Sequence, residues 1–506
     1  MVEREPASLS RRDVLRLGAL SGTASLLGAP ALTGTGRSGG LVATAQAAEA
    51  PFGPPPGGTI GEARGWDDYP RMLARIRAPA FPDRDFPITD FGAVADGQVE
   101  ASDAIARAIA ACAEAGGGRV VVPPGGFLTG PIVLRSNVNL HLAEGATLRF
   151  VTDPARYPTV FTRWEGVECM NYSPLVYAFG QENIGLTGKG VLDGQASRET
   201  WWAWKATYFN EPGPDLQAED QRALIAMGEK GVPVEQRVFG QGHKLRPNFF
   251  QAYRCRDVLV EDVTFVRSPM WEMHPALSTN VTVRGVKVSS HGPNNDGCDP
   301  ESCWDVLIEN CEFDTGDDCI AIKSGKNNDG RRVNVSSENI VVRGCHMKDG
   351  HGGVVLGSEC TGHIRNVFVE DCEMDSPHLE RVLRFKDNAA RGGVLENVFA
   401  RNVRVGRVAE AIITIDLLYE EGAKGGYKPA VRNVQMDKIT ASSAPRVMYI
   451  VDFPGSVIDG IRLSNCVFKG VESSEVVASS GTIELRNVVI EPKDRPASLS
   501  TRVGPL

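Results

Sequence analysis

The chain has 506 residues, more than one compact core usually holds, which indicates several domains or one elongated repeat. Hydrophobic residues make up 42% and charged residues 23%, a composition typical of soluble proteins. The formal net charge of −9 argues against nucleic acid or an anionic membrane as partner of the surface as a whole. An acidic polymer would need a local basic cluster as its binding site.

Residues 1–47 have the pattern of a twin-arginine signal peptide. Arg11 and Arg12 precede a weakly apolar run that Gly, Ser and Thr interrupt well short of a membrane-spanning length. Ala45-Gln46-Ala47 has the A-x-A form of a cleavage site. We expect a mature chain that begins at Ala48 and is exported to the periplasm or the outside. After cleavage we expect no contact with the membrane.

The eleven cysteines are an odd number for an exported protein. Twin-arginine substrates cross the membrane folded, so the fold should not require disulfides. No C-x-x-C pair or His partner stands at zinc spacing, and we expect no metal site. Four thiols follow short strand-like runs at similar places and predict a stack of buried thiols: Cys311, Cys345, Cys372 and Cys466.

The segments before the main array predict an arm and a cap. Residues 48–85 are rich in proline and glycine and predict a linker or an arm that wraps the body. A strand and turn follow at 86–97. Residues 101–114 have helical spacing, with Ser102 or Asp103 as the N-cap. A helix just before a long β array suits a cap over its open end.

A strand unit that opens with Asn or Asp recurs along the rest of the chain. It begins at 257, 280, 305, 339, 366, 397, 433 and 487, so that the first two spacings are 23 and 25 residues. Units of this size predict a solenoid, because they are too short for the four strands of a propeller blade. Val, Ile, Cys and Phe should face inward, and the corner Asn side chains should bond along the stack. We predict an all-β fold, a single right-handed parallel β-helix over residues 86–506.

Two insertions interrupt this array. Residues 201–246 are polar and partly helical, and residues 326–338 form a charged loop rich in asparagine. Long loops in a regular solenoid usually build or fence the binding face. We therefore expect both insertions beside the functional site.

Aspartates gather where two successive strand runs end. Asp296 lies in PNNDG, and Asp317 and Asp318 stand side by side in GDD. Neighbouring carboxylates repel one another, so this grouping does not stabilise a fold. It does separate their pKa values, which can leave one carboxyl protonated beside an ionised one. Such a pair is suited to hydrolysing a glycosidic bond.

Two further motifs should lie on the next coils of the solenoid. His351 stands in G-H-G; a lone histidine is usually structural, but beside an acid pair it can tune Asp317 through a hydrogen bond. Arg384 and Lys386 alternate on a strand, so both point the same way. On an ordinary sheet face they would be solvated charges. Here they can form the basic cluster that an acidic sugar requires.

The order N-x-D, G-D-D, G-H-G, R-x-K resembles glycoside hydrolase family 28, the polygalacturonase family, which folds as a right-handed β-helix. The flanking stretches DFGAVADG, LDGQ and SPMWEMHP match as well, and the resemblance spans residues 86–403. Asn295 stands where the family usually has Thr. The resemblance implies an inverting hydrolase of α-1,4-galacturonosyl linkages that acts on polygalacturonate or pectic oligosaccharides without a cofactor.

The family pattern also implies catalytic roles. Asp317 would be the general acid, while Asp296 and Asp318 activate the water, with carboxyls roughly 6.5–9.5 Å apart. The physical argument agrees, since two ionised neighbours raise the pKa of the third carboxyl. Which of the three is the acid follows from the family and not from spacing.

The expected substrate-binding set is wider than Arg384 and Lys386. Asn294 opens the N-x-D motif, and Lys323 is a weaker candidate for the basic cluster. Trp271 and His274 either contact a sugar or pack in the core. We expect a monomer, and the resemblance is nearer to bacterial exo-acting members than to endo-acting ones.

Other functions remain open at this point. A rhamnogalacturonan or substituted-galacturonan hydrolase belongs to the same family, but that branch generally lacks the histidine and the R-x-K pair. A pectate lyase would share the β-helix and use calcium with an arginine base. A non-catalytic pectin-binding protein would need no clustered acids.

Overall fold

The computed structural model describes residues 61–209, 214–473, 481–493 and 501–503. The predicted signal peptide and the first part of the predicted arm, up to residue 60, lie outside the described residues. Within the described ranges, no helix is both long and apolar enough to cross a bilayer.

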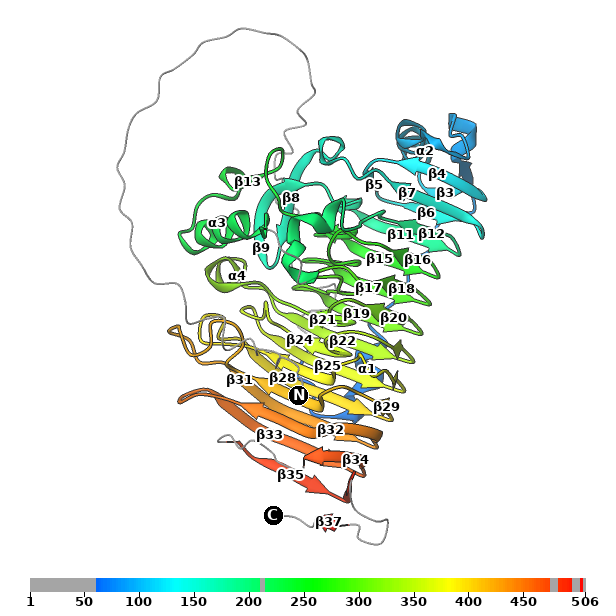
Figure 1. The fold of residues 1–506 in the computed structure, drawn as a ribbon. Helices are drawn as coiled ribbons and strands as arrows, with labels where there is room; N and C mark the ends of the chain where they lie inside the picture. The colour runs from blue at the N-terminus through cyan, green and yellow to red at the C-terminus, as the bar shows by residue number, and fades with distance from the viewer. Residues whose placement is uncertain (1–60, 210–213, 474–480, 494–500, 504–506) are drawn as a thin grey trace, which may run out of the picture. The chain divides into compact units, whose positions relative to one another are not determined.

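Parallel strands stack coil upon coil along the chain (Figure 1) and form a right-handed parallel β-helix, as the sequence predicts. One face is a 13-stranded sheet in chain order. Its strands are β1 (Asp85–Pro87), β3 (Gly118–Val122), β6 (Val138–Leu142), β11 (Glu182–Gly188), β15 (Arg256–Glu261), β17 (Thr279–Arg284), β19 (Trp304–Glu309), β22 (Ser337–Arg343), β25 (Ile364–Glu370), β28 (Val394–Arg401), β31 (Ala430–Asp437), β33 (Val457–Ser464) and β35 (Ile483–Arg486).

Two more faces close each coil. The second face contains β2 (Asp96–Glu100), β4 (Gly125–Thr129), β7 (Ala146–Phe150), β12 (Val191–Asp193), β16 (Thr264–Val266), β18 (Lys287–Ser290), β20 (Glu312–Thr315), β23 (His346–Met347), β26 (Glu373–Met374), β29 (Arg404–Arg407), β32 (Thr440–Val451), β34 (Val467–Ser473), β36 (Val488–Pro492) and the antiparallel β37 (Thr501–Val503). The third face contains β5 (Ile132–Val133), β10 (Val176–Phe179), β14 (Phe250–Tyr253), β21 (Ile320–Ile322), β24 (Val354–Leu356), β27 (Arg381–Lys386) and β30 (Ala411–Asp416). Single bridges through Met273 and Cys298 connect β14 to β21.

Alternate side chains of every coil point into one continuous core. Ile308, Val342 and Val369 occupy the same register on three successive strands and are at most 2% exposed. Burying an aliphatic side chain of this size contributes about 1.5–3 kcal/mol, so the core grows with each added coil. All eleven cysteines are free and buried, which confirms the prediction of buried thiols.

Asparagine and aspartate side chains bond along the corners of the stack, as predicted. Asn183 donates to Asn137 at 3.0 Å, and Asn433 donates to Asn397 at 2.8 Å. These four residues have φ between 50° and 65°, a backbone conformation that Asn tolerates better than most residues. The repeat therefore begins with Asn or Asp because the corner needs both a left-handed backbone and a bonding side chain.

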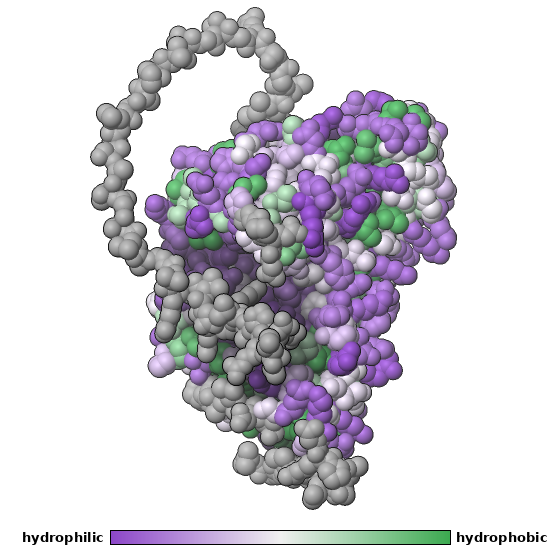
Figure 2. All heavy atoms as spheres, in the orientation of Figure 1, coloured by the Kyte–Doolittle hydropathy of each residue, from purple (hydrophilic) through white to green (hydrophobic). Residues whose placement is uncertain are grey.

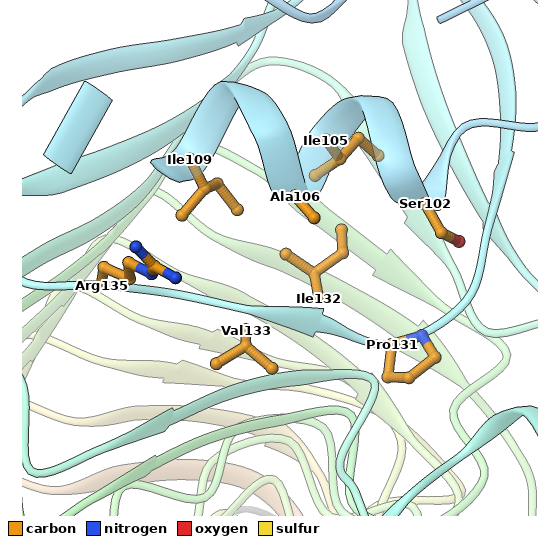
Figure 3. Close-up of a pocket in the computed structure, with 8 residues that line it drawn as sticks. All are labelled: Ser102, Ile105, Ala106, Ile109, Pro131, Ile132, Val133 and Arg135. Atoms are coloured by element: carbon orange, nitrogen blue, oxygen red, sulfur yellow. The ribbon is translucent and has the colours of Figure 1, made fainter. Parts of the chain in front are cut away.

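The helix predicted at residues 101–114 is α2 (Ser102–Glu114), which covers the first coil. The predicted N-cap is wrong: Ala101 occupies that position, and the Ser102 hydroxyl instead accepts from the Gly130 amide at 2.6 Å. Between the helix and the edge of the third face lies a small pocket, where Ile105 and Ile109 point toward Ile132 (Figure 3).

The described part of the predicted arm lies against the outside of the 13-stranded sheet. It contains η2 (Trp66–Asp68) and α1 (Tyr69–Leu73), and the rings of Trp66 and Tyr69 pack against Phe368 with centroids 5.4 Å apart in both pairs. The Arg75 guanidinium binds Asp305 at 2.9 Å. These contacts fasten the arm to several coils.

Extra elements gather on one side of the coils and are called here the insert lobe (Figure 1). They are β8 (Thr159–Trp164), β9 (Val167–Tyr172), η5 (Trp201–Phe209), α3 (Ala218–Glu229), η6 (Val234–Gln236), β13 (Val238–Phe239) and α4 (Asn327–Val333). The partly helical insertion at 201–246 is as predicted, but the predicted loop at 326–338 contains a helix. The short 3-10 helices η3 (Ile88–Phe91) and η4 (Pro154–Arg156) lie outside the lobe and the arm.

Candidate active site

Successive coils bring the predicted motifs together on one side of the β-helix. Asp296 precedes β19, the Asp317–Asp318 pair lies between β20 and β21, and His351 lies between β23 and β24. Arg384 and Lys386 belong to β27, which pairs with β24. One carboxylate oxygen from each of the three aspartates lies within 4.8 Å of the others. The structure therefore brings these predicted residues together.

The turn that carries Asp296 is fixed by Asn295. Its side-chain oxygen accepts from the Gly292 amide at 2.8 Å and from the Ser290 hydroxyl at 2.7 Å, while its amide donates to the Met270 carbonyl at 3.0 Å. Asn295 accepts with its oxygen and donates with its nitrogen, so it connects three separate segments at this turn.

Asn294 has φ of 55° and lies beside a buried arginine. Its side-chain oxygen accepts from the Arg246 guanidinium at 2.7 Å, and Arg246 also donates to the Pro293 carbonyl at 2.6 Å. This anchor holds the start of the N-x-D turn against the insert lobe. Asn294 is therefore placed as a support of the turn, and its expected contact with substrate stays a prediction.

His351 and Asp317 form a close pair. The Nδ1 atom of the imidazole lies 2.9 Å from Oδ1 of Asp317. Attraction to this carboxylate raises the pKa of His351 to about 9. Burial alone would raise the pKa of Asp317, but His351, Lys386 and Arg384 together hold it below its ordinary value. In the free protein the proton of this pair therefore resides on the imidazole.

Asp318 is fully buried and faces two cations. The Lys386 ammonium lies 2.6 Å from one of its oxygens, and the Arg384 guanidinium lies 3.5 Å from the other. Both cations are themselves mostly covered, with side chains 7% and 12% exposed. The R-x-K pair therefore points at the acid cluster, as its alternate spacing on the strand predicts.

Asp296 is buried on the inner side of the cluster. Burial raises its pKa well above the ordinary value, and the neighbouring Asp299 and Asp317 act in the same direction. Ionised neighbours are expected to raise the pKa of Asp317, but in the free protein its pKa is lowered. The positive charges of His351, Lys386 and Arg384 outweigh the neighbouring carboxylates.

The side chains of Trp271 and His274 are both buried. His274 is fully buried: its Nδ1 contacts Asn248 and Gln251 at 2.8 and 2.9 Å, and its Nε2 lies 2.8 Å from Glu301. Trp271 is 3% exposed. Both side chains pack inside the protein, so the alternative of direct sugar contact is not supported.

Two tyrosines lie at the site but are not predicted from the motifs. Tyr208, from η5, donates its hydroxyl to the Gly316 carbonyl at 2.7 Å, directly before Asp317. Tyr419, after β30, lies with its ring 5.6 Å from the Arg384 guanidinium and 5.4 Å from the Lys386 ammonium. Tyr419 follows the strand of the coil after R-x-K, and this position in the repeat could have predicted its place at the site.

The surroundings of the cluster suit a polar, acidic ligand. The insert lobe borders a hollowed surface of mainly hydrophilic residues beside the coils (Figure 2). Three clustered carboxylates could also surround a cation. Here, however, the His351 imidazole contacts Asp317 and the Lys386 ammonium contacts Asp318. The arrangement offers proton donors and acceptors together with fixed positive charge.

Comparison with known proteins agrees with this geometry. Residues 234–484 match the model of the family described as "Glycosyl hydrolases family 28". The crystal structure of a hyperthermoactive exopolygalacturonase from Thermotoga maritima is 45% identical, with a TM-score of 0.82 over 85% of this chain and 96% of that one.

Curated relatives give the same family. A probable polygalacturonase of Vitis vinifera is 26% identical over 75% of this chain and 73% of its own length. An exo-poly-alpha-D-galacturonosidase of Dickeya chrysanthemi is 27% identical over 78% of this chain and 68% of its own length. With its β-helix, its ordered motifs and these relatives, the chain belongs to glycosyl hydrolase family 28 and is a glycoside hydrolase.

Proposed function

We propose that this chain hydrolyses α-1,4-galacturonosyl linkages of polygalacturonate from a chain end, with inversion at the anomeric carbon. The observation that carries the proposal is the cluster of three carboxylates within 4.8 Å of one another beside a buried arginine–lysine pair. The relatives described above are named as polygalacturonases, and two of them as exo-acting.

Arg384 and Lys386 bind the carboxylate of the galacturonate next to the scissile bond. Both cations lie beside Asp318 in the free protein, at 3.5 and 2.6 Å, and the centroid of the Tyr419 ring is 5.6 and 5.4 Å from them. A sugar carboxylate is attracted by the same two charges, and arginine can hold it with two parallel hydrogen bonds. This explains how a chain with net charge −9 binds a polyanion.

Asp317 acts as the general acid once substrate is bound. In the free protein Arg384 and Lys386 help to lower its pKa. A bound carboxylate offsets part of their field, so the pKa of Asp317 rises on binding. The proton that His351 holds can then move across the 2.9 Å contact to Asp317 and on to the leaving oxygen.

Asp296 and Asp318 position and deprotonate the attacking water. The nearest oxygens of the three carboxylates are closer together than the roughly 6.5–9.5 Å expected between the carboxyl groups of an inverting pair. The assignment of inversion therefore rests on the family resemblance. Proton NMR of the first product tests it, because inversion of an α-linkage releases the β-anomer and retention releases the α-anomer.

The exo mode is supported by the insert lobe. Tyr208 of η5 bonds to the turn that carries Asp317, so part of the lobe reaches the acid cluster itself. An insertion there can close one end of the binding surface and leave room only for a chain terminus. The 45% identical exopolygalacturonase favours the same mode. Export by the twin-arginine route, to the periplasm or the outside, is part of this proposal because the substrate is a polymer.

Product analysis on polygalacturonate in the presence of EDTA tests the function. We expect saturated monomer or dimer from the start of the reaction, and a loss of about 10²–10⁴-fold in rate for Asp317→Asn. Asp314→Asn is the matched control, since this aspartate lies on β20 three residues away, is 32% exposed and contacts His291. It should leave the rate unchanged.

The other outcomes are equally informative. A ladder of saturated oligomers would keep the hydrolase and reject the exo mode. Unsaturated products that absorb in the ultraviolet would indicate a lyase. An inactive wild-type enzyme that still binds polygalacturonate would replace catalysis with a binding function.

A further inference from the structure

Lys323, which follows β21, lies behind Asp296 in a closed environment. Its side chain is 3% exposed, and its ammonium lies 3.7 Å from Asp296, 3.3 Å from Asp299 and 3.2 Å from Glu359. The Trp271 ring covers it, with the ring centroid 4.4 Å from the ammonium. Three carboxylates and an aromatic face thus surround this one cation.

These contacts engage the Lys323 ammonium with the protein's own groups. They do not support its expected contact with a sugar carboxylate. Arg384 and Lys386 form their ion pairs with a single acid, Asp318, whereas Lys323 forms ion pairs with three carboxylates. The charge on Lys323 acts on the protein's own acids.

Of the three carboxylates around Lys323, Asp296 is the one that the proposed mechanism uses, at 3.7 Å from the ammonium. Burial, Asp299 and Asp317 raise its pKa, and Lys323 is the cation that opposes them. The ionisable groups around Asp296 come from the insert lobe and neighbouring coils: Tyr208, Glu272, Asp299, Asp317, Asp318 and Lys323. Among the charges with the largest effects on the pKa of Asp296, Lys323 is the cation. The carboxylates around it favour the protonated form of Asp296, whereas a catalytic base must be ionised.

We propose that Lys323 is the positioning residue of the base: its ammonium favours the ionised form of Asp296 and holds the carboxylate toward the water, with Glu359 as the anchor that fixes the lysine. The inference rests on the proposed function, in which Asp296 helps to activate water. It assigns Lys323 to the activation of water, through Asp296, instead of to substrate binding. No bond to substrate is required of it.

Glu359 competes with Asp296 for the same cation. Its Oε2 lies 3.2 Å from Lys323, and its Oε1 lies 3.6 Å from Lys326. Burial would raise the pKa of Glu359, but Lys323 and Lys326 hold it below its ordinary value, so its negative charge is permanent in the working range. Removing that charge should strengthen the hold of Lys323 on Asp296. Removing the Lys323 charge should have the opposite effect.

The test is the acidic limb of the pH profile of kcat/KM on polygalacturonate. In Lys323→Met the limb should move to higher pH by about 1–3 units, because the base loses its counter-charge. In Glu359→Gln it should move to lower pH. Lys323→Arg should keep the wild-type limb. Lys326→Met is the matched control: this lysine is 4% exposed and contacts Glu165 and Glu359 but not Asp296.

Shifts in opposite directions would support the inference, since a general loss of folding lowers the whole profile without moving the limb. An unmoved limb in both Lys323→Met and Glu359→Gln would overturn it, even if both enzymes are slower. A carbon-13 NMR titration of the Asp296 carboxyl, assigned by its loss in Asp296→Asn, measures the same pKa without turnover. In Lys323→Met the pKa of Asp296 measured in this way should also rise. If it does not, the inference is overturned, and this result does not depend on whether polygalacturonate is the substrate.

Discussion

The same coils carry charged residues on two faces, arranged in opposite ways. On the outer side of the 13-stranded sheet acids and bases alternate strand by strand in one register. The row is Glu261, Arg284, Glu309, Arg343, Glu370, Arg401 and Asp437. Three of its arginine–glutamate pairs are separated by 2.6 Å, with the arginines 33–39% exposed. This alternating row is called here the outer ladder.

On the opposite side of these coils acid stands next to acid. Asp296, Asp299 and Asp318 are buried, and the Asp317 side chain beside them is 19% exposed. Exposed pairs contribute about 0.2–1 kcal/mol each, whereas an uncompensated buried charge costs several kcal/mol. The outer ladder, which contributes only to stability, thus pairs each acid with a base. The acid cluster, where a proton must be transferred, groups like charges.

The largest effect is expected when a cation of the acid cluster is removed. Lys386→Met should lower kcat/KM at least about a thousandfold and destabilise the fold by about 3–5 kcal/mol, because it leaves the Asp318 carboxylate buried without its 2.6 Å partner. Steady-state kinetics and urea unfolding measure the two losses. Lys348→Met is the control, since Lys348 is 38% exposed and pairs with Glu312 on the surface. Equal losses in both variants would contradict the distinction between the two faces.

The sequence predicts the site because the fold is periodic. Once the repeat is recognised, Asp296, Asp317, His351 and Arg384 must fall on consecutive coils, whatever their distance along the chain. The corner residues follow in the same way, since Asn and Asp open each unit.

The burial of a side chain does not follow the repeat, so it is harder to predict from the sequence than the coil on which the residue lies. Lys323 and His274 both look available on their coils, but side chains of neighbouring coils enclose them, such as Glu359 at Lys323 and Glu301 at His274. The imidazole on Asp317 reverses the expected order of pKa values, because a contact of 2.9 Å outweighs the count of neighbouring acids. The helix α4 forms in a stretch whose composition indicates a loop, with its first residue tied to Thr361.

A smaller effect of opposite sign is expected at Glu272. This fully buried side chain has a raised pKa, mainly because burial disfavours its charge, and Asp296 and Asp317 add to the rise. A carboxyl with a raised pKa costs no stability below its unfolded value near pH 4–5, and its cost grows as the pH increases above that value. Glu272→Gln should therefore stabilise the protein by about 1 kcal/mol or more at pH 7 and by less at pH 4.

Urea unfolding of Glu272→Gln at the two pH values gives the comparison. Glu312→Gln serves as the control, because Glu312 is 40% exposed and its pKa is lowered, chiefly by the hydrogen bond from Lys348. Its loss should destabilise slightly at pH 7, where the carboxylate is charged. A loss of stability in Glu272→Gln at pH 7 would mean that this carboxylate is needed in its charged form.

The smallest effect is expected on the outer ladder. Arg284→Met removes the 2.6 Å pair with Glu261 and should cost less than about 1 kcal/mol, an effect that shrinks further in high salt while kcat/KM stays the same. Arg284→Glu places three acids in line along the outer ladder, with the like-charge order of the acid cluster but in contact with water. It should destabilise more than Arg284→Met at low salt and recover in high salt. If high salt does not restore the stability of Arg284→Glu, screening by solvent does not explain why the outer ladder accepts charge. The difference between the two faces would then come from packing.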